Sequence, residues 1–553
     1  MVSSRALSRS IRLGLAVAAA ACSIVLVTGC GSGDRTVGGT ATVEMSIPPD
    51  YLDPQLAYTT EGAEADWISY TPLLTYRHKN APAGSELIPG LALRLPQVSA
   101  NGKRYVLTLR RGLVYSNGQS VKASDFEYTI ERAIRLGWGG KRFITDNVVG
   151  AEKYDSREAK GISGIDADDS TGRISILLQH PFGAFGNVLA LPATGLVPSG
   201  TPMRDLSRNP PPGVGPYRIT EVIPNRAWTM VKNPGFERLD IPGIPVGSLE
   251  RIKVGIEPNA VGAADDVLHN RADNFDPGTR LPPVSLLQAR SIAGDRFDPV
   301  PIPSTFYFFM NATTPPFSSE LARRAVVTAL DRPALAQLSN GSLEPDCYLL
   351  PEGIPGHPSD SCPYGDADGN GDVGLAKQLV KQSGTRDASV TVWGEDSAPQ
   401  RAYVRYYVHL LGRLGYRVRT RLVQPSGYFA RIGNARSNAQ TGFAGWYNDF
   451  PNPADFYEVA NASSIRPAHG ANVSRISDLF IQQELEKLNL IPAQDLASAA
   501  SQWRDLDEYT AKKAYLAVFG MQQVPKLMSD RINFGSAVIH PLFLSDWSSW
   551  SLK

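Results

Sequence analysis

Hydrophobic and polar positions follow two different periods along the chain, which predicts strands interleaved with helices. Alternation of apolar and polar or aromatic side chains predicts strands over residues 105–110, 173–178, 305–311 and 416–423. Apolar residues at helical spacing predict helices over residues 126–134, 320–338 and 402–414. We expect Ser124 or Asp125 to cap the first of these helices and Pro333 to mark a break in the second. The alternating order predicts an α/β fold.

The length and composition add a domain count but no function. A chain of 553 residues is longer than one hydrophobic core usually serves, so two or more lobes are expected. Hydrophobic residues make up 42% and charged residues 20%, as in ordinary globular proteins. The formal net charge is +1, which gives no indication of nucleic-acid binding.

The first thirty residues predict an export signal with a lipid attachment site. Arg5, Arg9 and Arg12 precede a mostly apolar run over residues 13–27 that is short for a membrane span. The run ends in Val-Thr-Gly-Cys, which resembles a bacterial lipobox. We therefore expect a signal peptide over residues 1–29, a lipid on Cys30, a tether over residues 30–37 and an extracytoplasmic, membrane-anchored protein. The alternative is an ordinary signal peptide in which the cysteine is a coincidence.

Two further cysteines, Cys347 and Cys362, remain in the exported part of the chain. An even pair in an exported protein usually forms a disulfide, so we expect these two residues to be joined. Their spacing, without a histidine cluster nearby, disfavours a zinc site.

Six segments, in order, resemble the family 5 extracellular solute-binding proteins, which are peptide, dipeptide and nickel receptors of ABC importers. The segments are YLDP (51–54), LRRGLVYSNG (109–118), ASDF with IER (123–132), PGVGPY (212–217), YFFMN with PPF and ALDR (307–332) and GW with DFPNP (445–453). The resemblance covers nearly all of the chain after the predicted signal.

The resemblance implies an α/β, two-lobed periplasmic-binding-protein fold of the type II kind with an extra subdomain on the first lobe. The implied lobe I comprises residues 38–75, 214–303 and 526–553; the subdomain comprises residues 76–213 and lobe II residues 304–525. It further implies a monomeric receptor without a cofactor that binds a small molecule or peptide and delivers it to permease subunits coupled to a cytoplasmic ATPase. A non-peptide ligand such as an oligosaccharide or a nickel chelate remains an alternative.

Ligand-binding residues are expected in the cleft between the lobes. Asp449 stands three residues after Trp446, where the resemblance implies an aspartate that pairs with the α-ammonium group of a peptide. The structural alternative is that Asp449 caps the Pro-rich turn that follows, with Trp446 in the core. Tyr51 and Tyr58 could line the cleft from lobe I, although aromatic residues more often fill a core.

An acidic loop resembles the opening of a calcium-binding EF-hand loop. Asp366, Asp368, Asn370 and Asp372 would supply oxygen ligands, but Lys377 occupies the position where a bidentate Glu should complete the shell. The alternative is a solvated turn in which Asp372 caps a helix over residues 374–381.

No catalytic motif accompanies these features. The sequence has no nucleophile elbow, HExxH or Walker A motif, so we expect a binding protein rather than an enzyme. A surface-anchored hydrolase, or a sensor that reports ligand occupancy without transport, are the alternatives from other functional classes.

Overall fold

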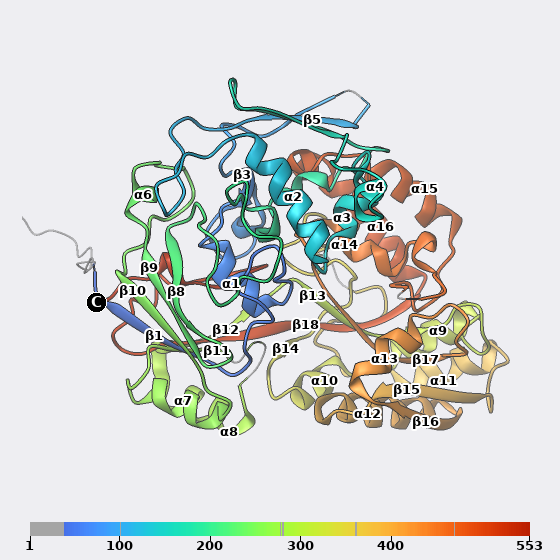
Figure 1. Ribbon diagram of the computed structural model, residues 1–553. Coiled ribbons are helices and arrows are strands. Elements are labelled where there is room, and N and C mark those ends of the chain that lie inside the picture. The colour runs from blue at the N-terminus through green and yellow to red at the C-terminus, as the bar shows by residue number, and fades with distance from the viewer. Residues whose placement is uncertain (1–37, 100, 277, 279–280, 360–361, 469) are drawn as a thin grey trace, which may run out of the picture. The chain divides into compact units, whose positions relative to one another are not determined.

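The computed structural model describes residues 38–553 except 100, 277, 279–280, 360–361 and 469 (Figure 1). The predicted signal peptide, Cys30 and the tether lie outside these residues. Within them, the strands form a five-stranded, a four-stranded and a seven-stranded sheet and two short pairs. Helices are interleaved with the strands, which confirms the predicted α/β class.

The five-stranded sheet is built from segments far apart in the sequence. In spatial order its strands are β11 (Asn274–Asp276), β1 (Thr40–Met45), β10 (Arg251–Ile256), β9 (Ala227–Lys232) and β8 (Tyr217–Ile223). β1 runs parallel to both β10 and β11, and α7 (Ala260–Leu268) and α8 (Pro283–Gln288) lie against one end of this sheet (Figure 1). The N-terminal segment is therefore fixed by strands that follow it by some two hundred residues.

The four-stranded sheet is antiparallel and local in sequence. Its order is β4 (Gln97–Val98), β5 (Arg104–Thr108), β7 (Arg173–Leu177) and β6 (Ile165–Asp168). The accompanying helices are α2 (Ser124–Leu136), α3 (Arg142–Thr145), α4 (Ala151–Asp155) and α5 (Phe185–Val188). The predicted strands at 105–110 and 173–178 are thus confirmed with slightly different ends.

The predicted cap of α2 is wrong. The N-cap is Ala123, and no side chain at that position caps the helix. Instead, the Ser124 amide donates to Asp169 of a neighbouring loop, 2.8 Å away. The Asp125 carboxylate accepts hydrogen bonds from the Tyr115 hydroxyl and the Lys122 amide. Tertiary contacts therefore replace the local cap.

The seven-stranded sheet is covered by helices on both faces. Its strands are β12 (Phe297–Pro301), β18 (Leu516–Leu527), β13 (Ser304–Met310), β17 (Thr441–Tyr447), β15 (Ser389–Glu395) and β16 (Arg417–Val423), with β14 (Leu343–Glu344) paired to β18. Phe308 and Met310 pack into the core beneath α9 (Glu320–Thr328), α11 (Val373–Gln382) and α12 (Ala398–Leu414). Tyr307 and Phe309 pack into the opposite core, beneath α13 (Pro425–Ile432), α15 (Leu479–Leu488) and α16 (Ala500–Lys512). Alternating residues of one strand therefore serve two cores, as in sheets buried on both faces.

Two sequence predictions in this region are confirmed. The helical pattern over residues 320–338 divides into α9 and α10 (Arg332–Leu338), and Pro333 stands in the first turn of α10. The Asp331 carboxylate caps α10 by accepting from the Ala334 amide at 2.9 Å. Cys347 and Cys362 form a disulfide.

β18 connects the two halves of the molecule. It pairs with β12, β13 and β14 in the seven-stranded sheet, and the residue after its end, Met528, bridges to Asn274 of β11 (Figure 1). The chain therefore crosses between the two large sheets at β18.

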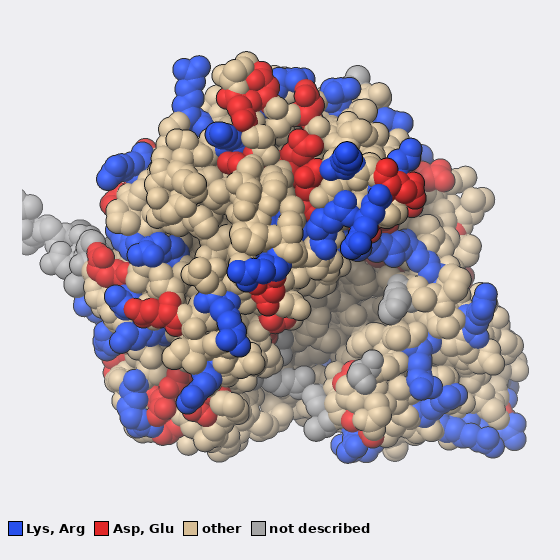
Figure 2. Space-filling view, viewed as in Figure 1, with Lys and Arg blue, Asp and Glu red and all other residues tan. Residues whose placement is uncertain are grey.

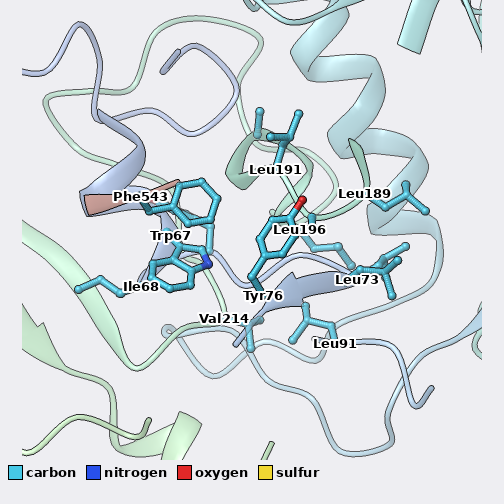
Figure 3. Close-up of a cluster of buried hydrophobic side chains, with 14 of the residues drawn as sticks. Trp67, Ile68, Leu73, Tyr76, Leu91, Leu189, Leu191, Leu196, Val214 and Phe543 are labelled. Carbon is cyan, nitrogen blue, oxygen red and sulfur yellow. The ribbon is translucent and has the colours of Figure 1, made fainter. Parts of the chain in front are cut away.

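A core rich in aromatic side chains surrounds α1 (Thr60–Trp67). Trp67 stacks on His78 with ring centroids 3.9 Å apart and packs against Phe543 at 4.7 Å. Figure 3 shows Trp67, Tyr76 and Phe543 packed beside Leu73, Leu91 and Leu191, all of which are buried. This core fixes α1 and the segment that leads into it.

None of the helices formed by described residues combines the length and apolar character needed to cross a bilayer.

Candidate functional site

The segment before α1 carries Tyr58, the first of the predicted cleft residues. Thr59 caps α1 through its side chain, which places Tyr58 immediately before the helix. The Tyr58 ring packs edge-on against Trp138, with centroids 6.2 Å apart, and the indole of Trp138 donates to the Ala57 carbonyl at 3.1 Å. A Cβ on Gly139 would lie 2.7 Å from the Tyr58 ring. Trp138 and Gly139 thus fix the position of Tyr58, and only a residue without a side chain allows so close an approach.

The segment after β17 carries Trp446 and Asp449. Trp446 belongs to β17 and pairs with Thr305, whereas Asp449 lies in the turn that follows the strand. Both are held by one buried residue, Asp455. Its Oδ2 accepts from the indole N–H of Trp446 and from the Asp449 backbone amide, each at 3.0 Å. Asp455 therefore orders the turn from within.

The structure excludes the capping role considered for Asp449. The N-cap of α14 (Pro453–Phe456) is Asn452, whose side chain accepts from the Ala454 amide at 3.0 Å. The Asp449 carboxylate points elsewhere: its Oδ1 accepts from the Tyr58 hydroxyl at 2.9 Å. Trp446 is half-buried and packs at the edge of the core beneath α13 and α16. Asp449 is thus not used to hold the turn together.

Tyr58 and Asp449 stand where two cavities meet. A cavity of about 400 Å³ is lined by Tyr58, Trp138 and Asp449, together with residues of α1. A second cavity of about 580 Å³ shares Tyr58 and Asp449 and also includes Trp446 and Asp455. These volumes lie within the usual range for small-molecule sites. Figure 2 shows Lys, Arg, Asp and Glu interspersed over the face seen in Figure 1, which is hollowed near its middle.

Burial governs the ionisation of this site. It raises the pKa of Asp449 above its usual 3.8, although the Tyr58 hydrogen bond opposes that change. Burial and the nearby Asp449 raise the pKa of Asp455 well above its usual value. No Lys or Arg side chain forms an ion pair with Asp449 within the described part of the chain. A cation entering either cavity would find a carboxylate that gains more from a partner than it would in water.

Tyr51 does not join the other predicted residues. It is 37% exposed and lines a separate cavity of about 180 Å³ with Leu52 and Trp228. Neither of the two larger cavities includes it among their described lining residues. The structure therefore brings together Tyr58, Trp446 and Asp449 and leaves Tyr51 apart.

The acidic loop is tied to a helix by its last residue. The Asp372 carboxylate caps α11 by accepting from the Leu375 amide at 2.8 Å, as one of the two interpretations predicted. The Asp366 carbonyl accepts from the Gly369 amide, which closes a turn. Asp366, Asp368, Asn370 and Asp372 are not part of any group of three His, Cys, Asp or Glu side chains arranged to hold a metal ion, as far as the described residues extend.

Two residues of the site, Trp138 and Asp455, were not predicted from the sequence. Trp138 precedes Gly139 and Gly140, and paired glycines beside an aromatic residue are a signal of close packing that could have indicated it. Asp455 follows a proline in the first turn of a short helix, where an acidic residue ordinarily interacts with the helix terminus. Its burial beneath Trp446 depends on tertiary packing and had no signal in the sequence.

Comparison with known proteins yields one family and one fold. Residues 86–466 match the sequence model of the bacterial extracellular solute-binding proteins, family 5 Middle. The glutathione-binding protein GsiB of Shigella flexneri is 23% identical over 365 residues, and that of Salmonella choleraesuis 25% over 366 residues. Each alignment covers 63% of this chain and 64% of the relative, slightly less than two thirds of its length.

Solved structures resemble this chain over nearly its whole length. Clavulanic acid biosynthesis oligopeptide binding protein 2 superposes with a TM-score of 0.84 at 22% identity, covering 94% of this chain and 96% of that one. The periplasmic binding protein DppA of Helicobacter pylori, in complex with the peptide STSA, gives 0.66 at 19%, with 94% and 98% covered. AppA of Bacillus subtilis, in complex with a nonapeptide, gives 0.66 at 16%, with 94% and 100% covered. These likenesses establish the two-lobed fold of periplasmic binding proteins.

Proposed function

The chain belongs to the family 5 bacterial extracellular solute-binding proteins, and from this membership we propose that it captures a short peptide outside the cytoplasm for an ABC importer. The peptide lies in the cavities that meet at Tyr58 and Asp449. Its α-ammonium group pairs with Asp449, and Trp446 forms part of the wall. The receptor then delivers the peptide to permease subunits coupled to a cytoplasmic ATPase.

The observation that carries this proposal is the state of the Asp449 carboxylate. It lies at the junction of two cavities, accepts a hydrogen bond from Tyr58, and takes no part in capping the adjacent helix. Asp449 is half-buried, and a carboxylate that is partly removed from water without a cationic partner costs stability. A ligand ammonium would supply the missing charge.

The geometry also supports binding by closure. Tyr58 precedes α1, which packs in the core beside the five-stranded sheet, whereas Asp449 follows β17 of the seven-stranded sheet. A ligand at this junction contacts both halves of the molecule. Such a ligand shifts an open–closed equilibrium through its greater affinity for the closed state. We retain the predicted division into lobe I, subdomain and lobe II as part of this proposal, and the lipid on Cys30 as the anchor.

The experiment that tests the proposal is native mass spectrometry of the purified protein offered an equimolar mixture of short peptides, oligosaccharides and a nickel chelate. We expect mass increments that match peptides. Mass increments that match only a sugar or a chelate would be consistent with a receptor but would show that its ligand is not a peptide. Conversion of any component to products would instead indicate the surface-anchored hydrolase.

A further inference from the structure

The cavity of about 400 Å³ beside Tyr58 is acidic in a way that Asp449 does not explain. The charged side chains that line it are Glu61, Asp66 and Asp449, and its described lining residues include no Lys, Arg or His. The neighbouring cavity of about 580 Å³ differs, because Arg142, His180 and Arg466 lie beside its carboxylates. The two cavities that meet at Asp449 therefore have different electrostatic character.

Asp66 is the unusual member of the acidic set. Its side chain is fully buried on α1, and neither carboxylate oxygen has a hydrogen-bond partner among the described residues. Asp66 belongs to the residues around the cavity, but its side chain has no accessible surface in this structure, so a ligand cation contacts it only after a neighbouring side chain moves. Burial and the nearby carboxylates of Asp53 and Asp50 raise the pKa of Asp66 well above its usual value.

Other buried acids in the same region have partners. Asp53 is paired with Arg132, whose guanidinium lies 2.6 Å from each of its carboxylate oxygens. Glu64, on the same helix as Asp66, accepts from the Ser545 amide at 2.7 Å. The remaining guanidinium N–H groups of Arg132 donate to Gln55 and to the carbonyls of residues 202 and 204. The guanidinium of Arg132 therefore donates to these groups and forms no hydrogen bond with Asp66.

We propose that Asp66 binds a second cationic group of the ligand, so that the receptor favours peptides whose first residue carries a basic side chain. The inference rests on the proposed function, because it takes the α-ammonium group to lie at Asp449. The side chain of that first residue then extends into the acidic cavity. Glu61 also lines this cavity and adds negative charge to it.

The walls of the cavity suit a cation with an aliphatic stem. Trp138, Phe143 and Phe543 line it together with Leu191 and Leu542. Aromatic faces attract ammonium and guanidinium groups, and apolar side chains bury the methylene groups that carry them. Glu61 and Asp66 thus supply negative charge to a pocket whose walls are partly aromatic and aliphatic.

The test is calorimetric titration with two matched pairs of tripeptides. Lys-Ala-Ala is compared with norleucyl-Ala-Ala, and Arg-Ala-Ala with citrullinyl-Ala-Ala, because each neutral partner keeps most of the shape and loses the charge. We expect wild-type protein to bind a basic member of these pairs about tenfold or more tightly than its neutral match. Comparison of the two pairs shows whether ammonium or guanidinium is preferred.

The variant Asp66→Asn should lose this preference while binding norleucyl-Ala-Ala as wild type does. Glu64→Gln is the matched control, since it changes the same charge on the same helix at a residue that does not line the cavity; it should keep the preference. Equal wild-type affinity within both pairs overturns the inference and needs no variant. If the neutral peptides bind through Asp449 but the basic peptides bind no more tightly, the inference about Asp66 fails and the proposed function is retained. If none of the four peptides binds, both proposals fail.

Discussion

At the scale of single residues, the proposed site depends on two carboxylates that have no ion-pair partner among the described residues, Asp449, which is half-buried, and Asp66, which is fully buried. Asp449 and Asp66 line one cavity, and burial raises the pKa of both. Asp53 shows the ordinary solution, a buried carboxylate with a bidentate arginine. The contrast distinguishes Asp53, whose ion pair stabilises the fold, from Asp449 and Asp66, for which we propose ligand cations as partners.

The raised pKa of Asp449 predicts a pH dependence of peptide binding. A ligand ammonium favours the ionised carboxylate, so the complex binds fewer protons than the free protein. Affinity should therefore be constant between the raised pKa of free Asp449 and the pKa of the peptide α-amino group, about 8, and fall as the pH drops through the pKa of Asp449, by at most about tenfold per pH unit for one proton. Titration of one peptide across this range measures the effect. The same loss in Asp449→Asn would show that another group is responsible.

The sequence predicted part of this site and could not predict the rest. Trp446 and Asp449 lie in a segment with a recognisable motif, and Tyr58 is an aromatic residue in a polar segment. Asp66 carries no such signal, because an acidic residue in a short helix with other acids is ordinarily exposed. Its burial depends on tertiary packing, and the cavity beside it is lined by Trp138, Leu191 and Phe543 from segments distant in the sequence.

At the scale of elements, two of the motifs found in the sequence are joined by a buried ion pair. Asp53, from the segment before α1, forms a fully buried ion pair with Arg132 of α2. These residues come from two of the six segments that indicated the family. The strands and helices were predictable because their periodicity is local, whereas the cap of α2 and the crossing of β18 depend on contacts between distant segments.

The Asp53–Arg132 pair predicts a large effect of a small substitution. Asp53→Asn keeps the shape but leaves the Arg132 guanidinium buried without a counter-charge, which should lower the free energy of unfolding by about 3–5 kcal/mol. Chemical denaturation measures this change. Asp166→Asn is the control, because its ion pair with Arg173 is exposed and should contribute less than about 1 kcal/mol. Similar small effects at both sites would contradict the assignment.

The disulfide predicts a second change in stability. Cys347 and Cys362 are separated by 15 residues, and closing a loop of this length contributes about 3 kcal/mol when the folded state is not strained. We expect the double variant Cys347→Ser, Cys362→Ser to melt at a lower temperature than oxidised wild type. Reduction of the wild type should produce the same shift. Unchanged melting after complete reduction would contradict the prediction.

At the scale of the whole molecule, two large sheets joined across β18 bring the elements with Tyr58 and Asp449 together. A ligand bound at the proposed site would contact segments from both halves, which is the requirement for capture by closure. The sequence motifs indicated this fold correctly, and the likeness to solved structures confirms it. The cavity walls combine motif residues such as Asp449 with residues outside the motifs such as Trp138 and Phe543, which explains why the sequence left the identity of the ligand open.

The predicted lipid anchor is a property of the whole molecule that can be tested directly. Cys30→Ser removes the thiol that would carry the lipid, so we expect the protein either to leave the membrane fraction or to remain unprocessed. Cell fractionation and intact mass measurement distinguish these results from the wild type. A variant that keeps both the membrane location and the wild-type mass would show that Cys30 is not the attachment site.

The central claim, that Asp449 binds the α-ammonium group of a peptide, is tested most directly by a calorimetric cycle with a tripeptide and its N-acetylated form against wild type and Asp449→Asn. Losing one partner of a desolvated charge pair costs about 2–5 kcal/mol, or roughly thirtyfold or more in affinity. The account predicts that acetylation weakens binding to wild type by such an amount and affects Asp449→Asn much less. Equal binding of both peptides to wild type, or equal losses on acetylation in both proteins, would contradict it.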